Sequence, residues 1–248
     1  TEKSSGTKVF SLSGKIERSG LVEVPMGTSM REVVYKIGGG LPDNTDLKGI
    51  LIGGPAGGAL TYEHLDTRID YEELKELRCT LGSGALVAMD EGTCILDTVK
   101  YYMHFLKEES CGKCIPCREG IRRMYEILEN ITKRPQEEND SFTLHRFKGV
   151  INLERLAHVV RDTSLCGLGQ RAANPILSTI SAFRDEYEEH IFERKCRAGV
   201  CQELSTFYID VDQCTGCTIC AQKCPTGAIV GSAKKAHFIV QERCIGCG

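Results

Sequence analysis

The sequence predicts an α+β chain of several domains, and three changes of pattern along its 248 residues predict it. Residues 1–90 have the alternation and the Gly or Pro stops of short strands. Residues 91–192 have apolar residues at helical spacing. Residues 208–248 are poor in large apolar side chains, so a folded core there needs another source of stability. Twelve of the 14 cysteines fall between residues 111 and 247, which indicates that metal bound by thiolates is that source.

The first block predicts a small β-grasp-like domain followed by a strand and linker up to residue 90. Val9–Gly14 and Gly20–Pro25 alternate as two strands. Ser29 can cap a helix over Met30–Ile37. Gly49–Pro55 then predicts a buried strand that runs into a glycine turn. The glycines at 57–58 and 82–84 lack the spacing of a phosphate-binding loop, so no nucleotide site is expected here.

Residues 91–192 predict a four-helix bundle. Apolar side chains recur on one face in four segments, which are 94–106, 121–131, 153–160 and 176–187. The polar stretch Thr132–Asp140 predicts an exposed connection between the second and third helices.

Composition excludes several classes of function. The chain has 31 Lys and Arg against 34 Asp and Glu, a net charge of −3, so it has no basic excess for nucleic acid. It contains no apolar run long enough to insert directly into a membrane. The start has no signal-peptide pattern, and tight C-x-x-C runs favour metal-binding thiolates in a reducing cytoplasm. Because the chain ends inside such a run, we expect a segment of a longer protein.

The tail has the most specific motif, Cys214-x-x-Cys217-x-x-Cys220-x-x-x-Cys224-Pro225, followed by Cys244-x-x-Cys247. This is the ligand run of two-cluster ferredoxins, in which the fourth Cys binds the other cluster. The spacing predicts a truncated ferredoxin-like domain for two 4Fe–4S clusters over residues 208–248. Cys214, Cys217 and Cys220 would bind cluster one, and Cys224, Cys244 and Cys247 would bind cluster two, each lacking one ligand. A zinc ribbon or a disulfide knot is the alternative.

The helical block has a second motif, Cys111-x-x-Cys114-x-x-Cys117, with Cys166 further along. Three close thiolates and one distant thiolate suit a single 4Fe–4S cluster held between helices, with amides of Gly112 and Gly167 as donors to sulfur. On spacing alone, a zinc site remains an alternative.

The segment 193–207 predicts a hinge with a possible zinc site. Cys94, His190, Cys196 and Cys201 together supply the three thiolates and the imidazole of a Cys3His site. Reduced structural cysteines are the alternative. Cys79 has no assigned partner and is expected to be a small buried side chain.

The cysteine motif and its flanks resemble a known family. Glu109–Gly120, Thr163–Gly169 and Asn174–Pro175 are similar to the cluster-binding domain of the flavin-bearing, NADH-oxidising subunit of respiratory complex I, a subunit type that also occurs in NAD(P)-linked hydrogenases and formate dehydrogenases. Ser11–Gly58 resembles the soluble-ligand-binding β-grasp domain of those subunits. The ferredoxin-like tail resembles the extended form in electron-bifurcating FeFe-hydrogenases.

This resemblance implies an electron-transfer role in an NAD(P)H-dependent oxidoreductase, with no catalytic nucleophile or acid/base in this segment. FMN and NAD(H) would bind in an upstream domain, because the family's flavin-binding segment of the type G-R-G-G-A-G-F-P is absent here. Implied partners are a thioredoxin-like 2Fe–2S subunit, a substrate-activating subunit and soluble ferredoxin. The same role in a formate dehydrogenase or a complex I-like enzyme is one alternative. A zinc-stabilised scaffolding module is an alternative of another class.

Overall fold

A five-stranded sheet forms the first part of the chain in the computed structural model, which describes residues 1, 3–133, 140–204, 207–245 and 247. The strands are β1 (Thr7–Gly14), β2 (Gly20–Pro25), β3 (Leu47–Ile52), β4 (Gly58–Thr61) and β5 (Ala85–Asp90). They lie in the order β2-β1-β5-β3-β4. Only the central β1–β5 pair is parallel, and the other pairs are antiparallel. Strand β5, the last of these five strands in sequence, is therefore the middle strand of the sheet.

Short helical segments connect these strands. The segment Met30–Ile37 is helical, with π-helical geometry from Glu32, and the Ser29 hydroxyl accepts from the Glu32 amide at 3.2 Å. Helix α1 (Tyr71–Glu76) begins at Asp70, whose carboxylate accepts from the amides of Glu72 and Glu73. Single 3-10 turns cover Pro42–Asn44 and Tyr62–His64.

Glycine lets two turns of the sheet domain meet backbone to backbone. Gly53 and Gly82 both have positive φ, at 88° and 43°. A methyl group on Gly82 would lie 2.3 Å from the Gly53 carbonyl oxygen, and one on Gly53 would lie 2.1 Å from the carbonyl oxygen of Thr80. These glycines serve turn geometry, as the sequence predicts.

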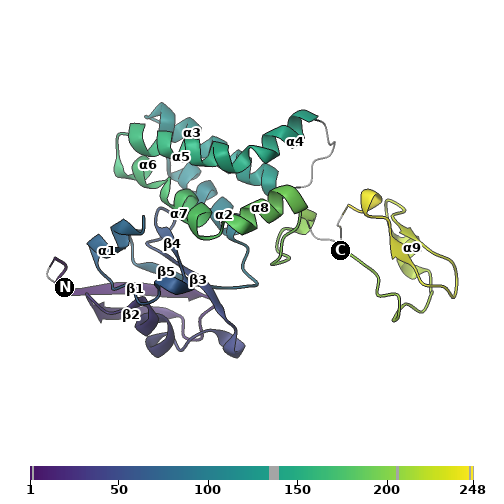
Figure 1. Ribbon diagram of the computed structural model, residues 1–248, viewed down its shortest axis with the longest axis horizontal. Coiled ribbons are helices and arrows are strands. Elements are labelled where there is room, and N and C mark those ends of the chain that lie inside the picture. Colours follow the sequence, from purple (N-terminus) through teal and green to yellow (C-terminus); the bar gives the residue numbers. More distant parts are fainter. Residues whose placement is uncertain (2, 134–139, 205–206, 246, 248) are drawn as a thin grey trace.

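Helices form a layer over the sheet (Figure 1). They are α2 (Ile95–Glu109), α3 (Ile115–Thr132), α4 (Asp140–Phe147), α5 (Gly149–Thr163), α6 (Gly167–Arg171), α7 (Asn174–Ala182) and α8 (Arg184–Glu188), with a π-helical turn over Glu189–Glu193. The long helices have amphipathic sequences, and their apolar faces form one core that also includes Leu51, Ala59 and Met89 of the sheet. Sheet and helices therefore fold against each other.

Helix α7 lies directly on the edge strand β4. The Ser178 hydroxyl accepts from the Ala59 amide at 3.0 Å, and the Asn174 side chain donates to the Ala56 carbonyl at 3.2 Å. These contacts satisfy backbone groups at an edge that would otherwise be open for pairing.

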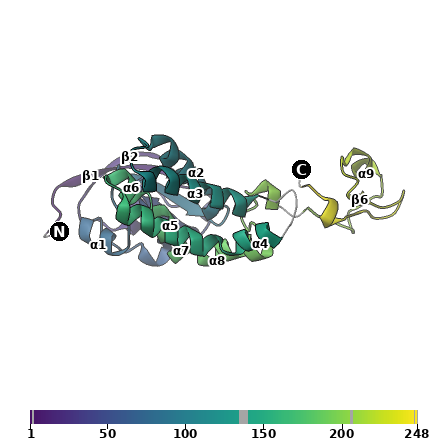
Figure 2. The same ribbon diagram turned by 90° about the horizontal axis from the view of Figure 1, so that it is seen from above.

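The tail follows α8 and a 3-10 turn over Gln202–Leu204. It consists of helix α9 (Ile219–Lys223), the antiparallel pair β6 (Ile229–Val230) and β7 (Phe238–Ile239), and a 3-10 turn over Gln241–Arg243. Figures 1 and 2 show this tail beyond α8, at the end of the molecule away from α6.

The helical block differs from the prediction in three places. The predicted helix 176–187 is two helices, because Phe183, with φ −136° and ψ 39°, interrupts α7 before α8. An additional helix, α4, begins at Asp140, the last residue of the predicted loop Thr132–Asp140, and residues 134–139 of that loop lie outside the described residues. A second additional helix, the short α6, follows Cys166. Among the described residues, no helix has both the length and the apolar content needed to span a bilayer.

Candidate metal centres

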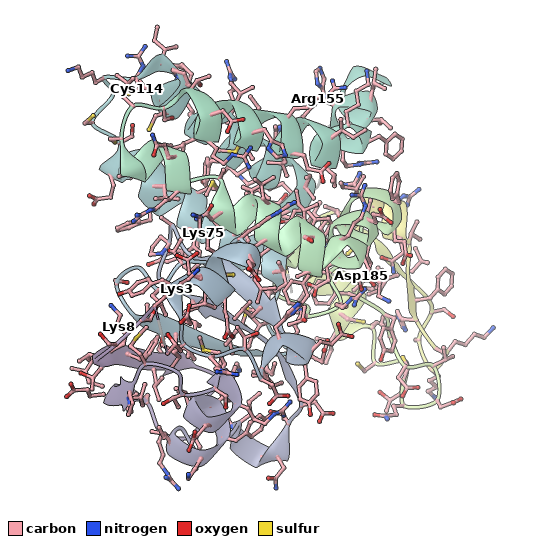
Figure 3. The ribbon with its side chains drawn as sticks, turned by 60° about the vertical axis from the view of Figure 1, so that its left-hand side comes forward. Lys3, Lys8, Lys75, Cys114, Arg155 and Asp185 are labelled. Carbon is pink, nitrogen blue, oxygen red and sulfur yellow. The ribbon has the colours of Figure 1, made fainter. Side chains whose placement is uncertain are left out.

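Two helix starts and the loop before α3 place the cysteines of the helical block. Cys114 directly precedes α3, Cys117 lies in its first turn, and Cys166 directly precedes α6. A methyl group on Gly169 of α6 would lie 3.2 Å from the Cβ of Cys117, so the two helix starts are in contact. Cys117 is buried and Cys111 and Cys166 are exposed, which places the group at the surface. Figure 3 shows Cys114 at the end of the helical layer away from Asp185 of α8.

Hydrogen bonds at this site favour the thiolate of Cys166 and fix the loop before α3. Backbone amides of Gly169 and Leu168 lower the pKa of Cys166. Arg118 donates to the Gly112 carbonyl at 2.8 Å, which closes the Cys111–Cys114 loop onto α3. The Gly112 amide donates to the Ser110 hydroxyl at 3.4 Å.

The donors to sulfur thus differ from the expected amides of Gly112 and Gly167. The hydroxyl of Ser110 lies 3.4 Å from the Cys117 sulfur, and the amides at Cys166 belong to the next two residues after Gly167. The first turn of α6 points these amides toward the N-terminal end of the helix, which is why they reach Cys166.

Ser164 supports a cluster at this site. Its side chain is buried, and its hydroxyl has no hydrogen-bond partner among the described residues. The hydroxyl would lie 2.5 Å from a methyl group on Gly169, beside Cys117. A buried hydroxyl without a partner is unfavourable, and sulfur atoms of a bound 4Fe–4S cluster are acceptors that could satisfy it. The residues present fit this group.

The second candidate centre joins two parts of the chain that are far apart in sequence. Cys94, His190, Cys196 and Cys201 are all buried, and their ligand atoms lie within 4.8 Å of one another. The Cys94 sulfur is 3.4 Å from His190 Nε2 and 3.8 Å from the Cys201 sulfur, and Cys201 is 3.6 Å from Nε2. Ideal tetrahedral zinc bonds would separate two sulfurs by about 3.8 Å, and a sulfur from a nitrogen by about 3.6 Å. The spacing therefore fits zinc.

The neighbours of this centre orient its ligands. His190 Nδ1 donates to the Glu186 carbonyl at 2.7 Å, which leaves Nε2 to face the sulfurs. The Cys94 sulfur caps α2 by accepting from the Asp97 amide at 3.5 Å. Hydrogen bonds from Cys201 and Cys94 hold the pKa of Cys196 below its ordinary value. By contrast, burial raises the pKa of the isolated Cys79 to about 12, as expected of a structural thiol.

The tail gathers cysteines around a cavity of about 270 Å³. Cys224, Cys244 and Cys247, the three residues predicted for cluster two, line it together with Cys220. Hydrogen bonds from the Thr226 hydroxyl and amide, and from the Ala228 and Ile229 amides, lower the pKa of Cys224 to about 7. A cavity walled by thiols with one readily ionised member fits an iron–sulfur cluster.

Of the cysteines predicted for cluster one, Cys214 has a defined partner. Its sulfur accepts from the His237 amide at 3.4 Å. The Gly216 backbone, at φ +69°, lies so close to Lys235 that a methyl group would be 2.5 Å from its amide nitrogen. Cys217 is exposed, and Cys220 faces the cavity described above.

Several residues beside these centres were not predicted from the sequence: Ser110, Ser164, Glu186 and His237. The two serines had a usable signal, because Ser110 directly precedes Cys111 and Ser164 lies two residues before Cys166. Glu186 and His237 had none, since only the fold brings them to Cys94 and Cys214.

Fold and site together define an iron–sulfur protein. Residues 97–190 match the NADH-ubiquinone oxidoreductase-F iron–sulfur binding region, and residues 207–230 match the 4Fe–4S binding domain. The predicted resemblance to NADH-oxidising subunits is confirmed.

Among curated relatives, the chain is 48% identical over 237 residues to the NADP-reducing hydrogenase subunit HndC of Solidesulfovibrio fructosivorans, covering 96% of this chain and 46% of that protein. It is 37% identical to the F subunit of the NADH-quinone oxidoreductase of Streptomyces coelicolor, covering 79% of this chain and 41% of that one. The crystal structure of an NAD+-reducing [NiFe]-hydrogenase in the H2-reduced state matches with a TM-score of 0.61 and 27% identity, covering 77% of this chain and 30% of that chain. The chain thus spans less than half the length of these relatives.

Proposed function

We propose that the chain is an electron-transfer segment of an NAD(P)H-dependent oxidoreductase of the hydrogenase type. One observation carries the proposal: two sets of cluster-ligand cysteines occur on a chain 48% identical, over 96% of its length, to a subunit of an NADP-reducing hydrogenase. Bound 4Fe–4S clusters would accept and pass on single electrons.

The ligands of the first cluster are Cys111, Cys114, Cys117 and Cys166 in this proposal. The amides at Cys166 and the Ser110 hydroxyl donate to sulfur, while Arg118 fixes the loop. Cys214, Cys217 and Cys220 bind one tail cluster, and Cys224, Cys244 and Cys247 bind the other. These assignments give three thiolates to each tail cluster and leave its fourth ligand unassigned.

The four-residue centre at Cys94 is structural in this proposal. A closed Cys3His zinc site has no open coordination position, so it stabilises the junction and performs no chemistry. The domain limits are 1–90, 91–192, 193–207 and 208–248. The strand order β2-β1-β5-β3-β4 supports the β-grasp assignment of the first.

FMN and NAD(H) would bind to another domain of the complete subunit. Electrons would pass between that flavin and the cluster at Cys111, and the tail would serve a partner. We infer a thioredoxin-like 2Fe–2S subunit, a substrate-activating subunit and soluble ferredoxin as partners. The complex that we propose first is an electron-bifurcating hydrogenase. An NAD-linked formate dehydrogenase or a complex I-like enzyme would use the segment in the same way.

Anaerobic reconstitution with iron and sulfide tests the proposal. We expect a brown protein with low-potential EPR signals on reduction, and loss of the bundle signal alone in Cys117→Ala. A colourless protein that binds only zinc would overturn it and favour the scaffolding module.

A further inference from the structure

A buried ion pair lies against the Cys3His centre. Lys48 of β3 and Glu186 of α8 are 2.5 Å apart, with side chains 4% and 1% exposed. Removing two charges from water is expensive, and an apolar pair of similar volume is often at least as stable. The free energy of folding alone therefore does not explain why this position holds an ion pair. The contacts of the two side chains suggest a specific role.

The side chains of the pair bind both backbone neighbours of Cys94. Lys48 Nζ donates to the Thr93 carbonyl at 2.6 Å. The Glu186 carboxylate accepts from the Ile95 amide at 3.4 Å. That amide is at the first position of α2, where no helical partner exists, so the carboxylate also suits the positive end of the helix.

Glu186 also touches the histidine side of the centre. Its backbone carbonyl accepts from His190 Nδ1 at 2.7 Å, one helical turn further on. Glu186 thus contacts Ile95, the neighbour of Cys94, through its side chain, and it contacts His190 through its backbone carbonyl. These two ligands are separated by 96 residues of sequence.

We propose that Lys48 and Glu186 are positioning residues that hold the Cys94 loop at the correct distance from His190, so that the β-sheet domain determines how tightly the hinge binds its metal. The inference rests on the zinc site proposed above. Neither residue coordinates the metal, and each acts through the backbone around Cys94.

The test measures zinc release from the complete chain to the chromophoric chelator 4-(2-pyridylazo)resorcinol. We expect Lys48→Met and Glu186→Leu, which remove the donor to Thr93 and the acceptor for Ile95, to weaken zinc binding by about 10- to 100-fold, the usual effect of changing a residue behind a metal ligand. The visible spectrum of the cobalt-substituted site should change as well, since it reports ligand geometry. The matched control is Lys36→Met, because this exposed lysine pairs with Glu32 at 2.7 Å within the helical segment Met30–Ile37 and, in the described part of the chain, has no hydrogen bond or ion pair with Cys94 or its neighbours. It should behave as wild type.

Iron content and absorbance of the bundle cluster report folding in the same samples. If Lys48→Met fails to fold, the exchanged variant Lys48→Glu with Glu186→Lys decides the question. It restores an ion pair, but the new carboxylate on β3 cannot donate to the Thr93 carbonyl, and the new ammonium group on α8 cannot accept from the Ile95 amide. Weak zinc binding in a folded exchanged variant would support positioning.

Wild-type zinc retention in the folded Lys48→Met and Glu186→Leu variants, or in the exchanged variant, would overturn the inference alone. A wild-type chain that retains iron but binds no zinc would overturn the proposed zinc site as well, so the two failures are distinguishable.

Discussion

At the scale of single residues, we predict that the Ser164 hydroxyl affects the midpoint potential of the bundle cluster. Ser164 is buried beside Cys117 and Gly169, and no described residue accepts its proton. A donor to cluster sulfur stabilises the reduced, more negative state. We expect Ser164→Ala to lower the midpoint potential of the bundle cluster in an EPR-monitored redox titration. One hydrogen bond of about 1 kcal/mol corresponds to roughly 40 mV for a one-electron couple.

Ser178→Ala is the matched control for that titration. Ser178 is also buried, but its hydroxyl is already paired with the Ala59 amide and the Asn174 carbonyl. Its loss should leave the cluster potential unchanged. Equal potentials for Ser164→Ala and wild type, at equal iron content, would show that the Ser164 hydroxyl does not reach the cluster.

At the scale of elements, helices α3 and α5 are in close contact at a glycine. A methyl group on Gly120 would lie 2.2 Å from Cγ2 of Val160, which is fully buried and β-branched. Overpacking costs about 1–3 kcal/mol, whereas Ala gains about 1 kcal/mol of helix propensity. We therefore expect Gly120→Ala to lower the thermal midpoint of the helical signal by about 2–4 °C, as roughly 1 kcal/mol does in a chain of this size.

A double-mutant cycle checks the cause. In a Val160→Ala background the methyl group has room, so Gly120→Ala should be neutral or stabilising there. Strictly additive effects would mean that this contact is not what limits the approach of the helices.

Helix α1 predicts a local pH effect at its cap. Hydrogen bonds from the Thr1 hydroxyl and from the Glu72 amide lower the pKa of Asp70 below its ordinary value. A carboxyl whose pKa is lower in the folded state stabilises it above the unfolded pKa of about 3.9, and this contribution is lost as pH falls through the folded pKa. In Asp70→Asn, the Glu72 and Glu73 amides should thus exchange faster than in wild type at pH 7, and the difference should shrink as the pH falls below about 3.9 and through the lower folded pKa of Asp70. A constant difference would contradict the mechanism.

The sequence predicted elements better where the pattern is local. Strand β2 and the helix over Met30–Ile37 have the predicted bounds, because alternation and capping are read from neighbouring residues. The central position of β5 was not predictable, since pairing with β1 and β3 depends on contacts across more than 30 residues. The break at Phe183 was also missed, because the apolar period continues through it.

The candidate sites also divide into residues with a recognisable local sequence pattern, which were predicted, and residues without one, which were not. The spacing of His190, Cys196 and Cys201, together with the position of Cys94 at the start of a helix, predicted the four residues of the Cys94 centre, and the fold brings their ligand atoms within 4.8 Å of one another. The Lys48–Glu186 pair could not be found in this way, because an isolated Lys in a strand and a Glu in an acidic run give no sign that they meet.

At the scale of the whole molecule, the centre at Cys94 lies where the helical layer meets the tail. Two of its residues, Cys196 and Cys201, come from the segment that leads to the tail, while Cys94 and His190 belong to the helical layer. Cys114 lies at the other end of that layer (Figure 3), and so does α6, which Cys166 directly precedes (Figure 1). A structural metal here would fix the direction in which the tail leaves the body without touching the cluster at Cys111.

Removing zinc should therefore loosen the junction and spare the bundle. Structural zinc binds with an apparent free energy of about 10–16 kcal/mol, and without it the segment loses that stabilisation. Lys195 and Arg197 in this segment are trypsin sites near the surface, and Arg197 is paired with Glu189 at 2.7 Å. We expect a chelator, or His190→Gln without chelator, to speed cleavage at these two sites by about 10-fold or more, measured by mass spectrometry. The bundle-cluster absorbance should persist in the cleaved protein. Unchanged cleavage in His190→Gln, or equal loss of bundle cluster and junction, would show that the centre does not serve as a separate support for the tail.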